Sequence, residues 1–366
     1  MMKITDNTIT QGQFMFLVLQ TQIGVGVLSL PHQVQSEAKG AGWISILIAG
    51  LISQLVILLL WALVKRFPYS TIYEFLPKLF GKFAGTILGL AYVSYALFTA
   101  ADILVLFSDI VSRWILPATP RWVVILIVIG TCMYMAVENL RTISRFLVAT
   151  SILIPVFLAL TIYSLTVNIH PDYIFPLTEA GWLNIIKGSQ KAFFSMVGFE
   201  LILLAYPFVE GKSGGKLKAI SLANLIVTLL YAFMTFTSLV IFSPREIEVI
   251  PEPLLYILKS FTFNVIERID LIFLSIWSVS VFTTFISYIF MSMMGLGQYY
   301  HKGNHKKAAW WAGIICFILA MWAGQPEKIQ LYDKIFSIGS FIMIIAVPLL
   351  LLGWSYLFKV KGETNA

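Results

Sequence analysis

The chain has 366 residues, of which 59% are apolar, 14% aromatic and only 12% Asp, Glu, Lys or Arg. Soluble domains carry about 25% charged residues, so a chain with half that share cannot cover a water-facing surface. Apolar runs recur along the whole length, which predicts one integral membrane domain over residues 1–366 and no soluble module. The net charge of +7 does not indicate nucleic-acid binding, because Lys and Arg fall in short loops between apolar segments.

The first apolar stretch, Phe14 to Val34, follows a single Lys3 and lacks a small-residue cleavage site, so we expect it to remain as the first span. Cys132 and Cys316 lie inside apolar runs and are predicted to be small apolar residues without a disulfide partner. His301 and His305 have a His-x3-His spacing in a Lys-rich loop, where solvation is expected in place of zinc binding. We therefore expect no metal site and no cofactor.

Ten stretches are long and apolar enough to cross a membrane as helices, which takes about 20 residues each. They cover about residues 10–34, 43–64, 83–112, 122–138, 144–167, 186–208, 216–243, 269–299, 308–324 and 334–358. Barrel strands alternate in pieces of about ten residues, so these continuous runs predict an all-α protein with ten transmembrane helices.

The orientation follows from the distribution of basic residues, which are more frequent in cytoplasmic loops. With the N-terminus inside, 15 of the 25 Lys and Arg residues lie on the inner side, so both termini are predicted to be cytoplasmic. Two loops have helical character: Thr71–Leu79 on the inside and Pro253–Phe263 on the outside. The second either closes over the protein as a lid or lies as a loop against its outer face.

Two of the ten spans contain helix-breaking residues. The first has Gly24 and Gly26 near its middle with Pro31 after them, and the sixth has Gly198 in its middle and ends at Pro207. Such residues weaken a helix, and the freed backbone groups must find partners inside protein or at a polar cavity. Spans one and six are therefore predicted to be discontinuous, although small residues could also serve close helix packing.

The two predicted breaks occupy corresponding places in two five-helix halves, at about 10–167 and 186–358. Interrupted helices at corresponding positions are typical of transporter binding sites. Pro155 in span five and Pro348 in span ten also lie at similar depth. We therefore expect two structural repeats with the site between them.

Three ionisable residues are predicted to lie within the membrane, where a charge is costly and demands a purpose. Glu200 follows Gly198 by two residues. It either caps amides freed at the break or shapes the polar cavity, or else it reaches toward the interface or pairs structurally. Asp102 and Lys191 lie in the outer halves of spans three and six, where they pair with one another or each reach the interface. We treat Glu200, Lys191 and Asp102 as a possible intramembrane charge network.

Polar side chains at mid-depth on spans three and eight outline a cavity beside the breaks. They are Tyr95, Thr99, Thr283, Thr284, Ser287 and Tyr288. Each Thr or Ser alone could bond only to its own helix backbone, but together with two helix breaks they indicate one polar cavity.

Three motifs resemble a known family. The stretch from Gly24 to Pro31, the stretch from Met196 to Glu200, and Phe282–Phe285 with Tyr288 resemble the B subunit of spore germinant receptors, the spore germination permease family. The resemblance covers nearly the whole chain. That family is similar to the amino acid, polyamine and organocation transporters, so the resemblance implies a leucine-transporter-like fold of two inverted five-helix repeats with broken helices one and six.

The resemblance also implies a function, which is nutrient sensing in the inner membrane of a dormant spore, together with receptor A and C subunits and membrane lipid. The nutrient, expected to be an amino acid, would bind at Gly24, Gly26, Tyr95, Thr99, Val197, Gly198, Thr284 and Tyr288. An alternative is an ion-coupled amino acid transporter, in which Thr283 and Thr284 would help to hold sodium. No motif indicates an enzyme, since the sequence has no phosphate loop, metal signature or nucleophile elbow.

Overall fold

The computed structural model describes residues 7–166, 169–260, 268–323 and 326–362. The predicted span ends at 167 and 324, the end of the outer loop helix at 263, and Lys3 lie outside these ranges. Across the described residues the chain is helical, and its only β-type pairing is an isolated parallel bridge between Ile9 and Val209. The prediction of an all-α fold is confirmed.

The first half of the chain, in order, consists of α1 (Gln11–Gln22), η2 (Val25–Val27), α2 (Leu30–Ala38), η3 (Lys39–Ala41), α3 (Gly42–Val64), α4 (Ile72–Trp114), α5 (Arg121–Ala136), α6 (Leu140–Thr150) and α7 (Leu153–Ser164). A short η4 (Pro171–Ile174) leads into the second half. That half consists of α8 (Trp182–Ser195), η5 (Phe199–Leu201), α9 (Ile202–Ala205), η6 (Tyr206–Phe208), α10 (Ser213–Ile241), α11 (Pro244–Val249), α12 (Pro253–Lys259), α13 (Ile269–Tyr300), η7 (His305–Ala308), α14 (Ala309–Ala323), α15 (Pro326–Ser340), the π-helical η8 (Phe341–Ala346) and α16 (Val347–Leu357).

Within the described ranges, seven helices are long and apolar enough to cross a membrane, and the number is eight if the bent segment from α8 to η6 counts as one span. The predicted span one divides into α1 and α2, each far shorter than the roughly 20 residues that a crossing needs. The apolar helix α5 has only 16 residues. The protein is an integral membrane protein, and the count of ten spans stays a prediction.

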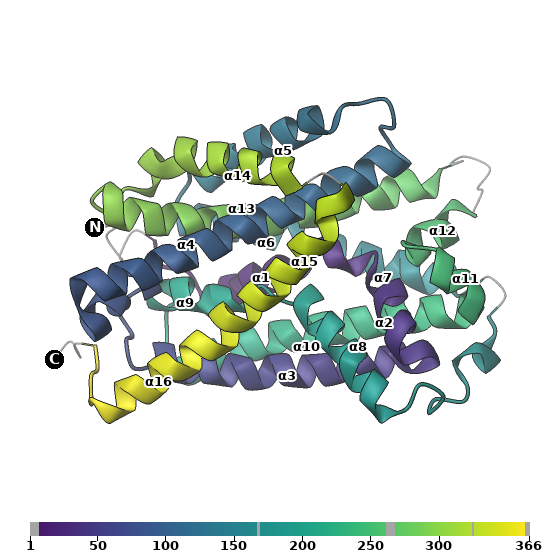
Figure 1. The fold of residues 1–366 in the computed structure, drawn as a ribbon, viewed down its shortest axis with the longest axis horizontal. Coiled ribbons are helices and arrows are strands. Elements are labelled where there is room, and N and C mark those ends of the chain that lie inside the picture. The colour runs from purple at the N-terminus through teal and green to yellow at the C-terminus, as the bar shows by residue number, and fades with distance from the viewer. Residues whose placement is uncertain (1–6, 167–168, 261–267, 324–325, 363–366) are drawn as a thin grey trace.

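Two groups of long helices enclose the broken segments. Figure 1 shows α4, α13 and α14 lying along one side of the molecule and α3 and α10 along the other, with α1 between them. The helices α15 and α16, drawn in yellow, cross the near face diagonally. The breaks themselves are buried, at residues 21–25 and 196–201, so protein surrounds their irregular backbone.

Backbone hydrogen bonds join the residue just before α1 to the end of η6. The amide of Ile9 donates to the carbonyl of Phe208 at 2.8 Å, and the amide of Glu210 donates to the carbonyl of Ile9 at 2.9 Å. This pairing links the residue just before α1 to the residues just after η6. The two broken spans are thus tied together at one end.

Prolines also interrupt the predicted spans five and ten. Span five is divided into α6 and α7, and Pro155 lies in the first turn of α7. In span ten, Pro348 lies in the first turn of α16, directly after the π-helical η8. Proline lacks the amide that would continue the preceding helix, so irregular turns precede both residues.

The two predicted loop helices exist. The inner one is the first part of α4, which begins with a capping box of Thr71 and Glu74 and is separated from the rest by Gly81 at φ +78°. The segment predicted to lie outside, residues 243–260, holds α11 and α12 and is called the outer segment below. Ser243 caps α11, and its hydrogen bond to Glu246 lowers the pKa of that carboxyl. The apolar side of α12 is buried against the protein, at Leu254, Leu255, Ile257 and Leu258.

Candidate ligand site at the two helix breaks

The first break follows Gln22, where α1 ends. Gly24 is extended, at φ −108° and ψ −152°, and its amide donates to the carbonyl of Gln22 at 3.1 Å. A Cβ added to Gly26 would lie 3.0 Å from the Cβ of Ser195, at the end of α8. Glycine at this position therefore lets the first break lie against the second.

The second break needs glycine for a different reason. Gly198 has φ +132°, a conformation that residues with a Cβ rarely adopt. A Cβ there would also lie 2.8 Å from the backbone carbonyl of Thr21. The side-chain amide of Gln22 donates to the carbonyl of Met196 at 2.9 Å, which pairs one backbone group that the break leaves free. The two breaks thus meet through backbone as well as side chains.

Glu200 is 1% exposed and joins the second break to the two helices opposite. One of its carboxylate oxygens accepts a hydrogen bond from the amide of Gly198 at 2.7 Å. The other accepts from the hydroxyls of Tyr95 on α4, at 2.9 Å, and Tyr288 on α13, at 2.5 Å. A buried carboxylate needs such donors, and they make Glu200 the meeting point of three elements.

Threonines of α13 contact the first break. The Thr284 hydroxyl lies 3.1 Å from the carbonyl oxygen of Gln20 and 3.3 Å from that of Ile23, and it also lies within hydrogen-bond distance of its own helix. Thr283 lies 3.2 Å from the side-chain oxygen of Gln20. The end of α1 is therefore held by polar groups of α13.

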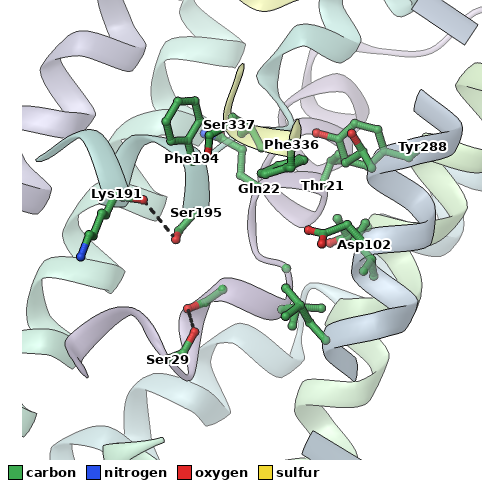
Figure 2. Close-up of a pocket in the computed structure, with 18 of the residues that line it drawn as sticks. Thr21, Gln22, Ser29, Asp102, Lys191, Phe194, Ser195, Tyr288, Phe336 and Ser337 are labelled. Carbon is green, nitrogen blue, oxygen red and sulfur yellow. Dashed lines mark hydrogen bonds between the residues drawn. The ribbon is translucent and has the colours of Figure 1, made fainter. Parts of the chain in front are cut away.

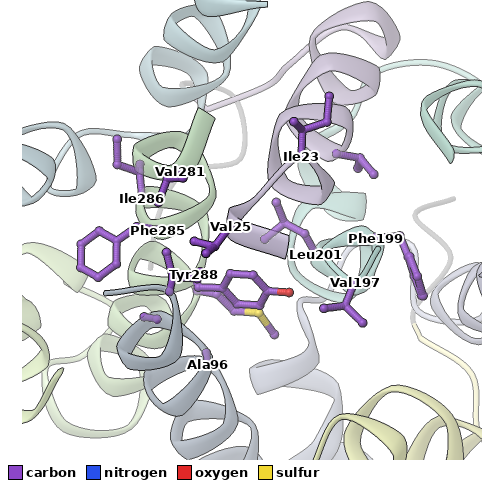
Figure 3. Close-up of a cluster of buried hydrophobic side chains, with 14 of the residues drawn as sticks. Ile23, Val25, Ala96, Val197, Phe199, Leu201, Val281, Phe285, Ile286 and Tyr288 are labelled. Atoms are coloured by element: carbon purple, nitrogen blue, oxygen red, sulfur yellow. The ribbon is translucent and has the colours of Figure 1, made fainter. Parts of the chain in front are cut away.

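Apolar side chains fill the space around these polar contacts. Figure 3 shows Val25 from the first break, Val197 from the second, and Phe285 and Tyr288 from α13 gathered in one cluster, with Ala96 of α4 beside them. Each is buried. This packing fixes the positions of the breaks.

A cavity of about 440 Å³ opens where the breaks face α4, α13 and α15. Its walls are formed by Thr21, Gln22, Gly24, Val25, Gly26, Ser29, Gln33, Thr99, Asp102, Ile103, Leu106, Lys191, Phe194, Ser195, Val197, Thr284, Tyr288, Phe336 and Ser337. Figure 2 shows Ser29, Lys191 and Ser195 on one side of this space and Asp102 and Tyr288 on the other. Ligand sites of small molecules are commonly clefts of this size.

Most of the predicted site residues line this one cavity. Those that do are Gly24, Gly26, Thr99, Val197, Thr284 and Tyr288, together with the charged Asp102 and Lys191. Tyr95, Gly198 and Glu200 are not among the lining residues, and they lie behind the wall as the bonded group described above. The structure thus brings the predicted residues together but divides them into a lining set and a supporting set.

Sequence reasoning missed four lining residues, Phe194 and Ser195 of α8 and Phe336 and Ser337 of α15. Phe194 and Ser195 follow Lys191 by three and four positions, a spacing that places them on one helix face. That periodicity could have identified them. Phe336 and Ser337 carry no comparable signal, because they come from a helix far along the chain that contains no break at that point.

The predicted charge network takes a different form. Lys191 pairs with Glu37 on α2, with 2.9 Å between the ammonium nitrogen and a carboxylate oxygen, and its ammonium also donates to Ser36 at 3.2 Å. Asp102 lies across the cavity (Figure 2). The packing of α2 against α8 brings the carboxylate of Glu37 to Lys191, and the pairing of Asp102 with Lys191 stays a prediction.

Comparisons with known proteins define first a class and then a family. The structure superposes on MhsT in complex with L-phenylalanine with a TM-score of 0.70 at 15% sequence identity, covering 95% of this chain and 89% of that one. It superposes on a Na⁺-coupled sialic acid symporter with a TM-score of 0.66 at 13% identity, covering 93% and 79%. The fold is thus the leucine-transporter-like fold of these membrane proteins.

The family is shown by sequence. The spore germination protein family matches residues 8–329. The chain is 25% identical to the spore germination protein GerQB of Bacillus cereus over 339 residues, which is 92% of each chain. It is also 25% identical to the spore germination protein YndE of Bacillus subtilis over 362 residues, covering 97% of this chain and 98% of that one. The chain belongs to the spore germination protein family, whose B-subunit-like members are not enzymes.

Proposed function

We propose that this chain is the nutrient-sensing subunit of a spore germinant receptor and that it binds an amino acid in the cavity at the two helix breaks. The observation that carries the proposal is that cavity, in a member of the spore germination protein family. The proposal includes ten spans in two inverted repeats, at about 10–167 and 186–358. It also places both termini in the cytoplasm, the chain in the spore inner membrane, and A and C subunits as its partners.

The chemistry of the breaks suits an amino acid. Backbone amides at a helix break can donate to a carboxylate, and Val25 and Gly26 of the first break line the cavity. The C-terminal end of α8 presents carbonyls, which favour an ammonium group, and Ser195 at that end also lines the cavity. Thr99, Val197 and Tyr288 are then left to contact the side chain.

Binding by the purified protein tests this proposal. We expect at least one L-amino acid to bind the chain in lipid nanodiscs in calorimetric titrations. Gly26→Ala should weaken that binding at least tenfold, because its Cβ would push against Ser195 at the cavity. Gly130→Ala is the matched control, since a Cβ there meets no atom within 4 Å. A chain that binds none of the twenty amino acids at millimolar concentration would contradict the proposal.

The partners are tested in spores. Germination in response to the amino acid found above should be lost when genes for the A or C subunits are deleted, while the purified chain still binds. A response that persists without either partner would show that the chain acts alone.

The alternative, an ion-coupled amino acid transporter, is favoured by one contact. The hydroxyl of Thr284 lies beside the carbonyl oxygens of Gln20 and Ile23 at the first break, and hard cations prefer such oxygen ligands. A coupled transporter needs an ion that binds its conformations with different affinity. Concentrative uptake of the amino acid into liposomes, driven by sodium and without partner subunits, would establish the transporter instead of the receptor.

A further inference from the structure

The cavity at the helix breaks has two charged residues among the described residues that line it, Asp102 and Lys191. Lys191 has a carboxylate partner already, since Glu37 lies 2.9 Å from its ammonium group, and both side chains are partly exposed. Asp102 is only 7% exposed. A charge in a buried wall acts more strongly on a ligand than a partly exposed one.

Asp102 belongs to a continuous strip of α4. Thr99, Asp102, Ile103 and Leu106 all line the cavity, and their spacing places them on one face of the helix. Asp102 thus stands between a hydroxyl and two aliphatic side chains. An ionised carboxylate has about four acceptor positions, so Asp102 can accept hydrogen bonds from a ligand beside the bonds that it makes within the protein.

The position of Asp102 in the cavity indicates which part of the ligand it would contact. The proposed function places the α-carboxylate and the α-ammonium of the amino acid at the two breaks. Asp102 lies on a different helix, across the cavity from Lys191 and Ser195 (Figure 2). The part of the ligand that reaches α4 is therefore the side chain.

A carboxylate in that position discriminates among side chains. A terminal donor forms a charge-assisted hydrogen bond with it, an apolar end would desolvate the carboxylate without replacing its bonds with water, and an acidic end would add a like charge. We infer that the ligand is an amino acid whose side chain ends in a hydrogen-bond donor, an ammonium, guanidinium or carboxamide group, and that Asp102 selects it. This inference rests on the proposed function.

Two pairs of probes test the inference by direct binding to the full chain in nanodiscs. L-lysine is compared with L-2-aminoheptanoic acid, in which a methyl group replaces the side-chain ammonium, and L-glutamine is compared with L-glutamate. In the wild type we expect the donor-bearing member of at least one pair to bind roughly 10- to 100-fold more tightly. Equal affinities within both pairs would overturn the inference without any mutation.

Substitution then assigns the selectivity to one residue. Asp102→Asn should reduce that ratio at least tenfold, and Asp102→Glu should keep the preference for the donor. Asp109→Asn is the matched control, because it makes the same change two turns further along α4 at an exposed ion pair with Arg113, and it should leave the ratio unchanged. Thermal unfolding of each variant establishes that it is folded.

The outcomes separate this inference from the proposed function. Failure of all twenty amino acids to bind overturns the proposed function and the inference together. An unchanged ratio in Asp102→Asn overturns the inference alone. Equal weakening of every amino acid in that variant also overturns it, because the carboxylate would then contact the α-ammonium group that all of them share.

Discussion

Gly198 has both a backbone conformation and a local environment that exclude a side chain. At φ +132° an L-residue is strained, and a Cβ would lie 2.8 Å from the backbone of Thr21. Strain of this kind costs about 1–3 kcal/mol. We expect Gly198→Ala to lower the melting temperature in detergent, whereas Gly130→Ala, in the open middle of a helix, should leave it unchanged or raise it. Equal melting temperatures for both variants would contradict the importance of the second break for stability.

Glu200 should tolerate no neutral replacement. Its two oxygens accept from Gly198, Tyr95 and Tyr288, but a glutamine has one acceptor atom and one donor group. Glu200→Gln must therefore lose or reverse at least one of the three bonds, at a cost of about 1–3 kcal/mol.

The readouts for that variant are thermal stability and germination at matched protein levels. Glu248→Gln is the control, because Glu248 is an exposed residue of the outer segment. If the two variants behave alike, the three bonds of Glu200 make no net contribution.

At the residue scale, the sequence indicated where a polar side chain lies more reliably than which side chains it contacts. The location of Glu200 two residues after Gly198 led to the expectation that it caps an amide of the break, and the amide of Gly198 is one of its donors. Its tyrosine partners are about ninety and one hundred residues away along the chain. Likewise, no local sequence pattern shows that Lys191 forms an ion pair with Glu37. Such choices depend on which helices pack together, which periodicity does not encode.

At the scale of elements, the buried carboxylate of Glu252 links the outer segment to α4. Glu252, with a side chain 3% exposed, lies 2.7 Å from the guanidinium of Arg113, and the indole of Trp114 also donates to it. Glu252→Gln removes the charge from this pair and leaves α12 less firmly attached. We expect faster amide hydrogen exchange over residues 253–259 in that variant.

Asp109→Asn again serves as the control, because Asp109 contacts the same arginine from an exposed position. Surface pairs contribute little, so exchange in α12 should not change. Similar exchange in both variants would mean that α12 is held by its apolar side alone.

The irregularities of the helices were predictable to the extent that glycine and proline cause them. Gly24, Gly26 and Gly198 mark both breaks, and Pro155 and Pro348 lie beside the irregular turns of spans five and ten. The π-helical form of η8 was not predictable, since Phe341–Ala346 is an ordinary apolar run. No local sequence signal shows that Phe336 and Ser337 of α15 line the cavity either.

At the scale of the molecule, the orientation is open to a labelling experiment. The basic excess predicts Lys306 inside and Lys187 outside, and both residues are exposed. In intact cells an impermeant thiol reagent should therefore label Lys187→Cys and not Lys306→Cys. The native Cys132 and Cys316 are buried and give the unlabelled background. Labelling in the reverse pattern would mean that the termini face outward.

The overall fold could be predicted from the sequence more readily than the number of transmembrane spans. Composition and apolar runs indicate a helical membrane protein, the family model matches residues 8–329, and the solved structures show the fold class. The count of ten spans stays a prediction, because the lengths of the broken segments are ambiguous. The separate pieces α1, α2 and α8 have 12, 9 and 14 residues, so a broken crossing is difficult to distinguish from short helices that enter and return.

The backbone pairing at Ile9 limits how the molecule can move. It joins the start of α1 to the end of η6, so sliding one past the other would leave backbone groups unpaired. We therefore expect the halves of the two broken spans that meet at this pairing to move together. A nutrient that binds between the breaks, as we propose, would then act on one equilibrium, and shifting it from 1:99 to 99:1 requires about 10⁴-fold tighter binding to the favoured state.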